Sequence, residues 1–472
     1  MPSVNRPGAF ACAAGDKLAA MNATLADLLS TFGTRPSLKD AKAVRQRIDE
    51  VVRLAVFGAP EERELARYVI HAAAPELGAV PSSIQGLYMA RGRGEASGFT
   101  VPAVNIRGMA YDMSRALFRA MQATNGAATV FELARSEMGY THQDPAELAA
   151  VVLAAAIAEG YQGPVFIQGD HFQANAKKFA TDPEGETRAL EDLIRQAVAA
   201  QFYCIDIDAS TLVDLSFEKV SEQQAPNSKL TARLAKLVRD LEPDGVTISI
   251  GGEIGEVGKH NSTVEELTAY VDGVNEIVGP GFTGISKVSV QTGTSHGGIP
   301  LPDGSIATVA IDFDTLEAMS QTARERYGMA GAVQHGASTL PDELFHRFPE
   351  VETAEIHLAT GFQNLVMDHG KFPPDLLAEM RSYCEAELAN ERSEGETDTQ
   401  FFYKTRKKTW GPFKQQTWDI PADIRSALFA EMQAKFEFLI QQLKATDTRD
   451  VTLRYVEQTR VAIEPPAVTA RA

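Results

Sequence analysis

A chain of 472 residues that is 44 % hydrophobic and 23 % charged has the composition of a globular protein with a large core. Its formal net charge of −18 opposes non-specific binding to nucleic acid or anionic membranes, and no apolar run approaches the ~18 residues of a membrane span. Three widely spaced cysteines and the lack of a signal-peptide pattern predict a cytoplasmic protein.

The first hundred residues show the apolar spacing of helices. The pattern covers 18–29, 38–58 and 60–78, and a polar, glycine-rich segment at 91–98 is typical of a joint. We therefore expect residues 1–97 to form a helical N-terminal extension.

From residue 98 the pattern changes to short β-branched runs, each followed by a helical segment. The runs lie at 100–106, 127–133, 164–168, 202–208, 245–250, 284–291, 331–335 and 354–360. Eight strand–helix units of near-equal length predict an α/β fold in which residues 98–390 form a closed (β/α)8 TIM barrel. An open doubly wound sheet is the alternative.

Beyond the barrel the chain is again helical, at about 376–390 and 421–443, with a polar loop between. We expect residues 391–472 to form a C-terminal loop and helical extension with a disordered tail. The loop contains KTRKK at 404–408. Such a basic run is commonly a solvated loop or a subunit contact, and the alternative is that it reaches a second phosphate or a sulfonate of the substrate.

Three of the nine histidines fall at ends of predicted strands, where barrel enzymes carry their catalytic groups. They are His171 in QGDHF, His296 in TGTSHGG and His335 in VQHGAS. Three neutral imidazoles that converge on one rim suit Zn²⁺ and leave a fourth position for water or substrate. The sequence thus predicts a metal site, with three structural histidines as the alternative.

Carboxylates occupy comparable places and predict acid–base chemistry beside the metal. Asp170 precedes His171, and Glu253 and Glu256 follow the fifth strand in GGEIGEVG. Carboxylates whose pKa values are shifted by burial can donate and accept the protons that a metal-activated carbonyl substrate requires. For both glutamates a helix N-terminus or a surface loop is the competing interpretation.

Small residues follow the candidate ligands and predict an anion site. Gly297 follows His296, Gly336 and Ser338 follow His335, and Thr360 follows the eighth strand. Glycines let backbone N–H groups approach an anion, and the loops after strands seven and eight commonly hold phosphate in this fold. Together they indicate a phosphorylated substrate.

Two motifs offer other mechanisms. GTSHG at 293–297 matches the G-x-S-x-G element of serine hydrolases, but turn residues rather than a helix follow it. Lys287 could form a Schiff base, but it lies early in its strand, away from the rim, so we expect an internal salt bridge instead.

In this order, GDH, GGEIGEVG, TGTSHGG, VQHGASTLPDELF and HLATGFQN resemble the motifs of class II, zinc-dependent ketose-bisphosphate aldolases, the fructose- and tagatose-bisphosphate aldolases. The resemblance covers roughly 98–380. It implies that His171, His296 and His335 bind one Zn²⁺, with room for a second divalent or monovalent cation. It also implies that Asp170 is the catalytic acid/base and that Glu253 is an alternate metal ligand or lies behind the ligands.

The same resemblance implies a substrate site. Gly297, Gly336, Ser338 and Thr360 would hold the phosphate of a dihydroxyacetone-phosphate unit. Asn105 lies in VPAVNIRGMAYDM, which is similar to the family's first βα unit, and we expect it to contact the substrate. His357 stands where the family usually has Asn, and we expect a substrate contact there too.

The implied enzyme is a lyase of carbohydrate metabolism that cleaves or forms the C3–C4 bond of a phosphorylated ketose, giving dihydroxyacetone phosphate and an aldehyde. Asp170 would handle the C4 hydroxyl proton, and a carboxylate of the Glu253–Glu256 loop would protonate the product. The alternative is a non-catalytic barrel subunit that stabilises an aldolase, because YKTRKKTWGPF is similar to the companion subunit of tagatose-bisphosphate aldolases. We expect a homo-oligomer, dimer or larger, with a phosphorylated sugar as substrate.

Overall fold

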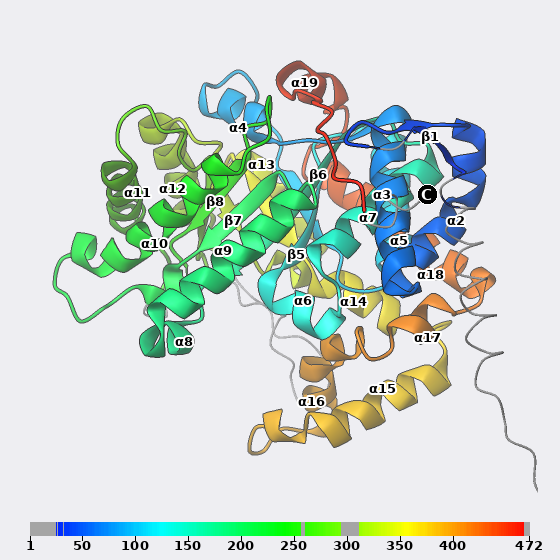
Figure 1. The fold of residues 1–472 in the computed structure, drawn as a ribbon. Coiled ribbons are helices and arrows are strands. Elements are labelled where there is room, and N and C mark those ends of the chain that lie inside the picture. Colours follow the sequence, from blue (N-terminus) through cyan, green and yellow to red (C-terminus); the bar gives the residue numbers. More distant parts are fainter. Residues whose placement is uncertain (1–24, 26, 32, 256–259, 294–310, 467–472) are drawn as a thin grey trace, which may run out of the picture.

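The computed structural model describes residues 25, 27–31, 33–255, 260–293 and 311–466, and at its centre lies a closed barrel of parallel strands (Figure 1). Each strand from β4 to β11 pairs with the next, and β11 pairs back with β4, which closes the barrel. The eight strands are β4 (Val101–Asn105), β5 (Val130–Ala134), β6 (Gly163–Gln173), β7 (Cys204–Asp208), β8 (Ser249–Glu253), β9 (Lys287–Val290), β10 (Ala332–Gln334) and β11 (Glu355–Leu358). The predicted (β/α)8 barrel is therefore confirmed.

Helices surround the barrel. They are α5 (Ala110–Ala123), α6 (Arg135–Thr141), α7 (Pro145–Glu159), α8 (Ala176–Thr181), α9 (Pro183–Ala199), α10 (Val220–Asp240), α11 (Val264–Val278), α12 (Phe313–Tyr327), α13 (Arg347–Glu350) and α14 (Thr360–Met367). Short 3₁₀ turns follow β7 and β10 as η1 (Ser210–Leu212), η2 (Ala337–Thr339) and η3 (Asp342–Leu344).

The N-terminal segment covers one of these helices. Helix α7 is apolar on all sides, and its residues 147–157 are all buried. A helix of this kind needs partners on every face. The barrel covers its inner side, and α2 (Ala41–Phe57) and α3 (Pro60–Glu76) pack against it from outside (Figure 1). The extension thus belongs to the hydrophobic core.

A helical N-terminal extension is present as predicted, and three short strands accompany its helices. β1 (Leu29–Thr31) and β2 (Ser37–Leu38) form an antiparallel pair, and β3 (Ala79–Pro81) pairs with β6. A tertiary contact holds the turn after β1, because the Tyr68 hydroxyl donates to the Gly33 carbonyl oxygen at 2.6 Å. Local apolar spacing carries no information about such a contact.

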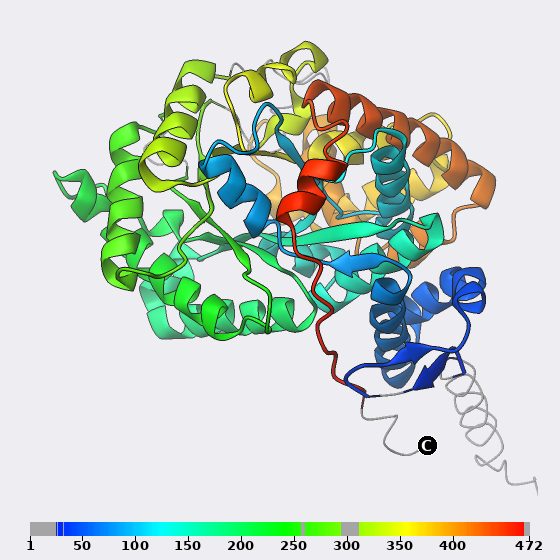
Figure 2. The ribbon, with the colours of Figure 1, turned by 90° about the horizontal axis from the view of Figure 1, so that it is seen from above.

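Opposite ends of the barrel are covered by different segments. α4 (Gln85–Gly92) and α19 (Arg449–Tyr455) lie across the end where the strands begin (Figure 2). The end near α6 and α14 carries a C-terminal segment of α15 (Pro374–Glu387), η4 (Ala389–Glu391), α16 (Asp398–Thr405), η5 (Arg406–Thr409) and α17 (Lys414–Trp418). α18 (Ala422–Gln442) then packs against α5. No helix in the described ranges is both long and apolar enough to cross a membrane.

Candidate active site

A bulge in β6 presents two adjacent side chains to the same cavity. Successive residues of a regular strand face opposite sides, but the pairing of β6 with β7 shifts register between Gly169 and Phe172. His171 lies within the shift and has a left-handed φ of 41°. Asp170 and His171 therefore both line the cavity. Gly169 is required here, because a Cβ atom would lie 2.3 Å from the Phe172 ring.

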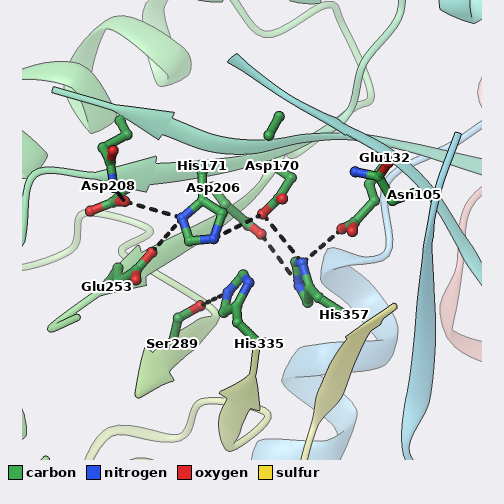
Figure 3. A network of polar contacts seen from close by, with 12 residues as sticks. Asn105, Glu132, Asp170, His171, Asp206, Asp208, Glu253, Ser289, His335 and His357 are labelled. Carbon is green, nitrogen blue, oxygen red and sulfur yellow. Dashed lines mark hydrogen bonds and ion pairs between the residues drawn. The ribbon is translucent and has the colours of Figure 1, made fainter. Parts of the chain in front are cut away.

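Three donor groups from separate strands could hold a metal ion (Figure 3). The donor atoms of His171, Glu253 and His335 all lie within 4.8 Å of one another. His171 Nδ1 lies 2.9 Å from Glu253 Oε2 and 3.1 Å from Asp208 Oδ2. His335 follows β10 directly, and its ring centroid lies 4.2 Å from that of His171. Two imidazoles and a carboxylate form a donor set typical of Zn²⁺.

Deeper in the barrel, His357 lies among carboxylates. Its Nδ1 lies 2.7 Å from Glu132 Oε2 and 3.2 Å from Asp170 Oδ1, and its Nε2 lies 2.6 Å from Glu355 Oε1 (Figure 3). Its ring centroid is 4.0 Å from that of His335. The three histidines therefore form a column along one side of the cavity.

Below this column the barrel interior holds a closed ion-pair layer. The Lys287 ammonium lies 2.9 Å from Asp206 Oδ2, donates to Gln168 at 2.8 Å and also contacts Glu355. Lys287 is 1 % exposed and Glu355 is fully buried. Gly251 leaves room for the layer, because a Cβ atom there would meet Asp206 at 2.2 Å. The internal salt bridge predicted for Lys287 is confirmed.

Burial and like charges shift the titration of the site. Burial raises the pKa of Glu253 to about 7, and that of Glu132 also to about 7, with nearby carboxylates adding to the effect. Burial alone would lower the pKa of His171 and of His357. The carboxylates of Asp170 and its neighbours outweigh burial and raise both pKa values well above the usual range. The described groups thus favour bound protons or a bound cation.

The cavity that these groups border has a volume of about 430 Å³ and lies at the C-terminal ends of the strands. His and carboxylate groups line it together with four cationic side chains, namely Arg107, Arg135, Lys178 and Lys407. Gly336, Ser338 and Thr360 line its wall near the N-terminus of α14, and the Gly361 N–H donates to Ser338 Oγ at 3.1 Å.

In the KTRKK segment one lysine lines the cavity, while the basic residues on either side of it form ion pairs outside the cavity. Arg406 binds Asp368 at 2.5 Å, and Lys408 binds Glu391 at 2.5 Å. Lys407 lies between them and lines the cavity. Within the described ranges Lys407 has no hydrogen bond and no ion pair. Burial, together with the nearby Arg107 guanidinium, lowers its pKa.

Trp410 fixes this segment against the first βα loop. A Cβ atom at Gly108 would lie 2.4 Å from the indole ring, so only glycine lets the two segments meet this closely. The neighbouring Arg107 donates from Nε to Asn105 Oδ1 at 3.0 Å and lies 3.5 Å from Glu137. Asn105 in turn donates to Glu137 at 2.5 Å. Arg107 and Lys407 are thus two neighbouring cations that line the cavity.

Most of the residues predicted for the site come together. Those that line or border the cavity are Asn105, Asp170, His171, Glu253, His335, Gly336, Ser338, His357 and Thr360. His296, Glu256 and Gly297 lie outside the described residues, as does most of the GTSHG segment. The pairing of Asp170 with His171 is not an orienting one, since Asp170 Oδ1 lies 3.9 Å from His171 Nε2 and Asp208 contacts the ring instead.

Several residues of the site were not singled out from the sequence, namely Arg107, Glu132, Asp206, Asp208 and Glu355. The alternation in VFELA, CIDID and EIHL held the signal for the acids. Charged residues two apart in an otherwise apolar strand face the barrel interior together.

Comparison with known proteins agrees with the family that the sequence motifs resemble. The family model described as fructose-bisphosphate aldolase class-II matches residues 92–409, more than half of the chain. No curated protein sequence gave a match. A solved structure described as a probable tagatose 6 phosphate kinase from Sinorhizobium meliloti 1021 is similar at 16 % identity and TM-score 0.53, covering 75 % of this chain and 98 % of its own.

Two further solved structures are similar at lower identity or lower TM-score. A fructuronate-tagaturonate epimerase from Cohnella laeviribosi has 12 % identity and TM-score 0.50, over 84 % of this chain and 86 % of its own. A fructose-bisphosphate aldolase from Campylobacter jejuni has 16 % identity and TM-score 0.45, over 78 % of this chain and 96 % of its own. At these identities the likeness concerns the fold alone.

Proposed function

The chain belongs to the class II fructose-bisphosphate aldolase family, and on this premise we propose that it is a zinc-dependent aldolase acting on a phosphorylated ketose. The observation that carries the proposal is the meeting of His171, Glu253 and His335 beside Asp170, at the C-terminal end of a barrel. Barrel enzymes carry their active sites at this end.

The donor set fits a zinc ion. His171 and His335 would supply nitrogen ligands, and Glu253 a carboxylate oxygen; His296 is proposed as a further ligand. Asp208 contacts His171 Nδ1 and would keep the ring orientation, as carboxylates behind metal-bound histidines do. When bound, zinc supplies Lewis acidity that polarises a carbonyl group.

Asp170 is the proposed acid/base at the bond that breaks. It is 5 % exposed and lines the cavity between His171 and His357. In the cleavage direction its carboxylate accepts the C4 hydroxyl proton as the C4 carbonyl forms, and the electron pair of the C3–C4 bond passes to C3. A proton delivered to C3 completes the ketone product. Glu253 and Glu256 are the proposed sources of that proton, and burial raises the pKa of Glu253 to about 7, near the working range of a proton donor.

Two parts of the cavity would hold the charged groups of the substrate. Gly336, Ser338 and Thr360, at the start of α14, offer backbone and hydroxyl donors to a phosphate. Arg107 and Lys407 also line the cavity and lie close enough to repel one another, and Lys407 makes no ion pair within the described ranges, although the Glu137 and Glu391 carboxylates partly offset its charge. Two partly desolvated cations side by side are unfavourable unless an anion joins them. We therefore propose a substrate with two anionic groups.

An assay with a panel of ketose mono- and bisphosphates tests the proposal. Protein purified with its bound metal should release dihydroxyacetone phosphate from at least one bisphosphate, and a chelator should stop the reaction until zinc is restored. Metal-free protein that is inert with every ketose phosphate would instead favour the companion-subunit alternative. Addition of such a protein to a separate aldolase would then raise the stability of the aldolase.

A further inference from the structure

Glu137 is a buried carboxylate of the cavity that the proposed mechanism does not use. It lies in the first turn of α6, is 8 % exposed and lines the cavity. Its position is set locally, because Glu137 Oε2 accepts the backbone N–H of Ala134 at 3.0 Å and so caps α6. The cap uses only part of the carboxylate, whose two oxygens can accept further hydrogen bonds.

The remaining acceptor capacity of Glu137 joins three other side chains that line the cavity. Asn105, at the end of β4, donates to Glu137 Oε2 at 2.5 Å, and the Tyr140 hydroxyl donates to Glu137 Oε1 at 3.2 Å. Arg107 Nε lies 3.5 Å from Glu137 Oε1 and donates to Asn105 Oδ1 at 3.0 Å. Arg107 is therefore held along its Nε edge by two neighbours that are bonded to each other.

A guanidinium held in this way is prepared to bind an oxyanion. The planar group carries five N–H donors, and contacts at Nε still allow the terminal N–H groups to meet a partner in the cavity. Arg107 is 8 % exposed, so most of its water is already removed. A side chain that is fixed before an anion binds loses little rotamer freedom on binding, which favours affinity.

Glu137 also acts on Lys407, the second cation beside Arg107. Burial and the Arg107 guanidinium lower the pKa of Lys407, and the Glu137 carboxylate opposes them together with Glu391. Two partly desolvated cations would repel one another more strongly without this negative charge. Glu137 thus favours the charged form of Lys407 and fixes Arg107 before a substrate arrives.

We propose that Glu137 is a positioning residue that makes the cavity selective for a ketose with a second oxyanion, such as a second phosphate. Arg107 and Lys407 would bind the oxyanion directly, and Glu137 acts through them. The inference deepens the proposed function, because it rests on the same cavity and on a substrate with two anionic groups. The contacts of Glu137 described above do not include Asp170 or the candidate metal ligands. Its loss should therefore change substrate affinity rather than the rate of bond cleavage.

Two uncleavable probes test the inference by binding alone. Hexitol 1,6-bisphosphate and hexitol 1-phosphate lack the ketone that an aldolase requires, and they differ by one phosphate. Calorimetric titration of the protein purified with its bound metal should show about 10–100-fold tighter binding of the bisphosphate, as expected for hydrogen bonds between charged groups. In Glu137→Gln, which keeps the size of the side chain and an acceptor oxygen, this ratio should fall to about threefold or less.

Glu62→Gln is the matched control, because it makes the same change in the same kind of helix cap. Glu62 lies in the first turn of α3, and its Oε2 accepts the backbone N–H of Ala59 at 2.8 Å, as Glu137 does for Ala134. Glu62 is not among the residues that line the cavity. The control should keep the wild-type ratio. An equal loss of selectivity in both variants would show an effect of helix capping alone and would overturn the inference.

Arg107→Lys provides a second variant in case Glu137→Gln does not fold. It keeps the positive charge but lacks the Nε edge that Asn105 and Glu137 hold, so it should lower the same ratio. Steady-state kinetics give a further measurement. Glu137→Gln should raise KM for a ketose bisphosphate about 10-fold or more and leave kcat within about threefold of wild type.

Equal affinity of the wild type for the two probes would overturn the inference, as would undiminished selectivity in Glu137→Gln or in Arg107→Lys. Any of these results with cleavage of a ketose phosphate retained leaves the proposed function intact. Selective binding of the bisphosphate that depends on Glu137, without cleavage of any ketose phosphate, supports the inference and overturns the aldolase proposal.

Discussion

Two layers of charged residues, stacked along the same strands, serve opposite purposes. The lower layer joins Lys287 to Asp206 and Glu355, and its atoms are sealed from solvent. The upper layer begins two residues further along the same strands, with Asp208 on β7 and His357 on β11. Side chains two residues apart on a strand face the same side. The charged residues of the closed ion-pair layer and those that border the cavity are therefore only two residues apart along each strand.

The layers differ in how far cations balance the negative charge of their carboxylates. In the lower layer an ammonium and an amide lie among the carboxylates, and their contacts are made within the protein. In the upper layer carboxylates and imidazoles outnumber fixed cations and face a 430 Å³ space. A buried network that is complete stabilises one conformation, whereas a network that lacks a cation is suited to bind one. Substitutions in the two layers should therefore have different effects.

The largest effect is expected for Asp170→Asn in the upper layer. The amide keeps the shape of the side chain but cannot accept the substrate proton, so kcat should fall by about 10²–10⁴. Rates of aldol cleavage measure the loss. His171→Ala is the companion variant, because it should lose zinc as well as turnover. Asp170→Asn with normal kcat would remove Asp170 from the mechanism.

In the lower layer, Lys287→Met should act on stability. Removing the ammonium leaves Asp206 and Glu355 buried without their cation, and the free energy of unfolding should fall by about 3–5 kcal/mol. Chemical denaturation at pH 7 measures the change. The control Lys236→Met, at an exposed position, should lie within about 0.5 kcal/mol of wild type. An unchanged stability for Lys287→Met would mean that the lower layer is not a structural element.

A smaller effect is expected at the cationic residues of the cavity. Lys407→Met should raise KM for an anionic ketose about 10–100-fold, equivalent to the ~1.5–3 kcal/mol of a hydrogen bond to a charged group. Stability should stay the same or rise, because Lys407 has no ion pair within the described ranges. The neighbouring Lys408→Met removes a lysine that binds Glu391 and should leave KM unchanged. Equal KM values for the two variants would contradict the proposed role of Lys407 in binding an anionic group.

The smallest effect is a pH dependence of the metal-free protein. In the folded state the pKa of Glu253 is raised to about 7, and the pKa of His171 is raised well above its usual value. Both groups hold protons that the unfolded chain releases at lower pH. The metal-free protein should therefore lose about 1–3 kcal/mol of stability as the pH rises from 5 to 8. Denaturation curves with chelator present measure this loss.

Metal should reverse that dependence, because zinc binds the deprotonated forms of the same groups. Denaturation of the zinc-loaded protein over the same pH range is the comparison. A metal-free protein that becomes more stable toward pH 8 would show that the upper layer does not hold excess protons.

Much of the fold was predictable because its signals are local. Eight β-branched runs alternating with helical segments predicted the barrel, and the strand ends predicted where His171, His335 and Asp170 would lie. The short strands at 29–38 and 79–81 were not predicted within the helical extension, because their pairing depends on Tyr68 and on β6, which are distant in sequence. The observed β8 also begins later than the predicted run 245–250, so that Glu253 ends the strand rather than following it.

The sequence by itself determined the strand–helix repeat, the family and the residues that could bind metal, because periodicity and motif spacing are encoded along the chain. Only the tertiary structure decided which charges meet. It gave Lys287 its two carboxylates and placed His357 between one of them, Glu355, and Glu132. It also brought Lys407 beside Arg107 across some three hundred residues of chain. Each of these depends on distances between separate strands and loops, which the order of residues does not contain.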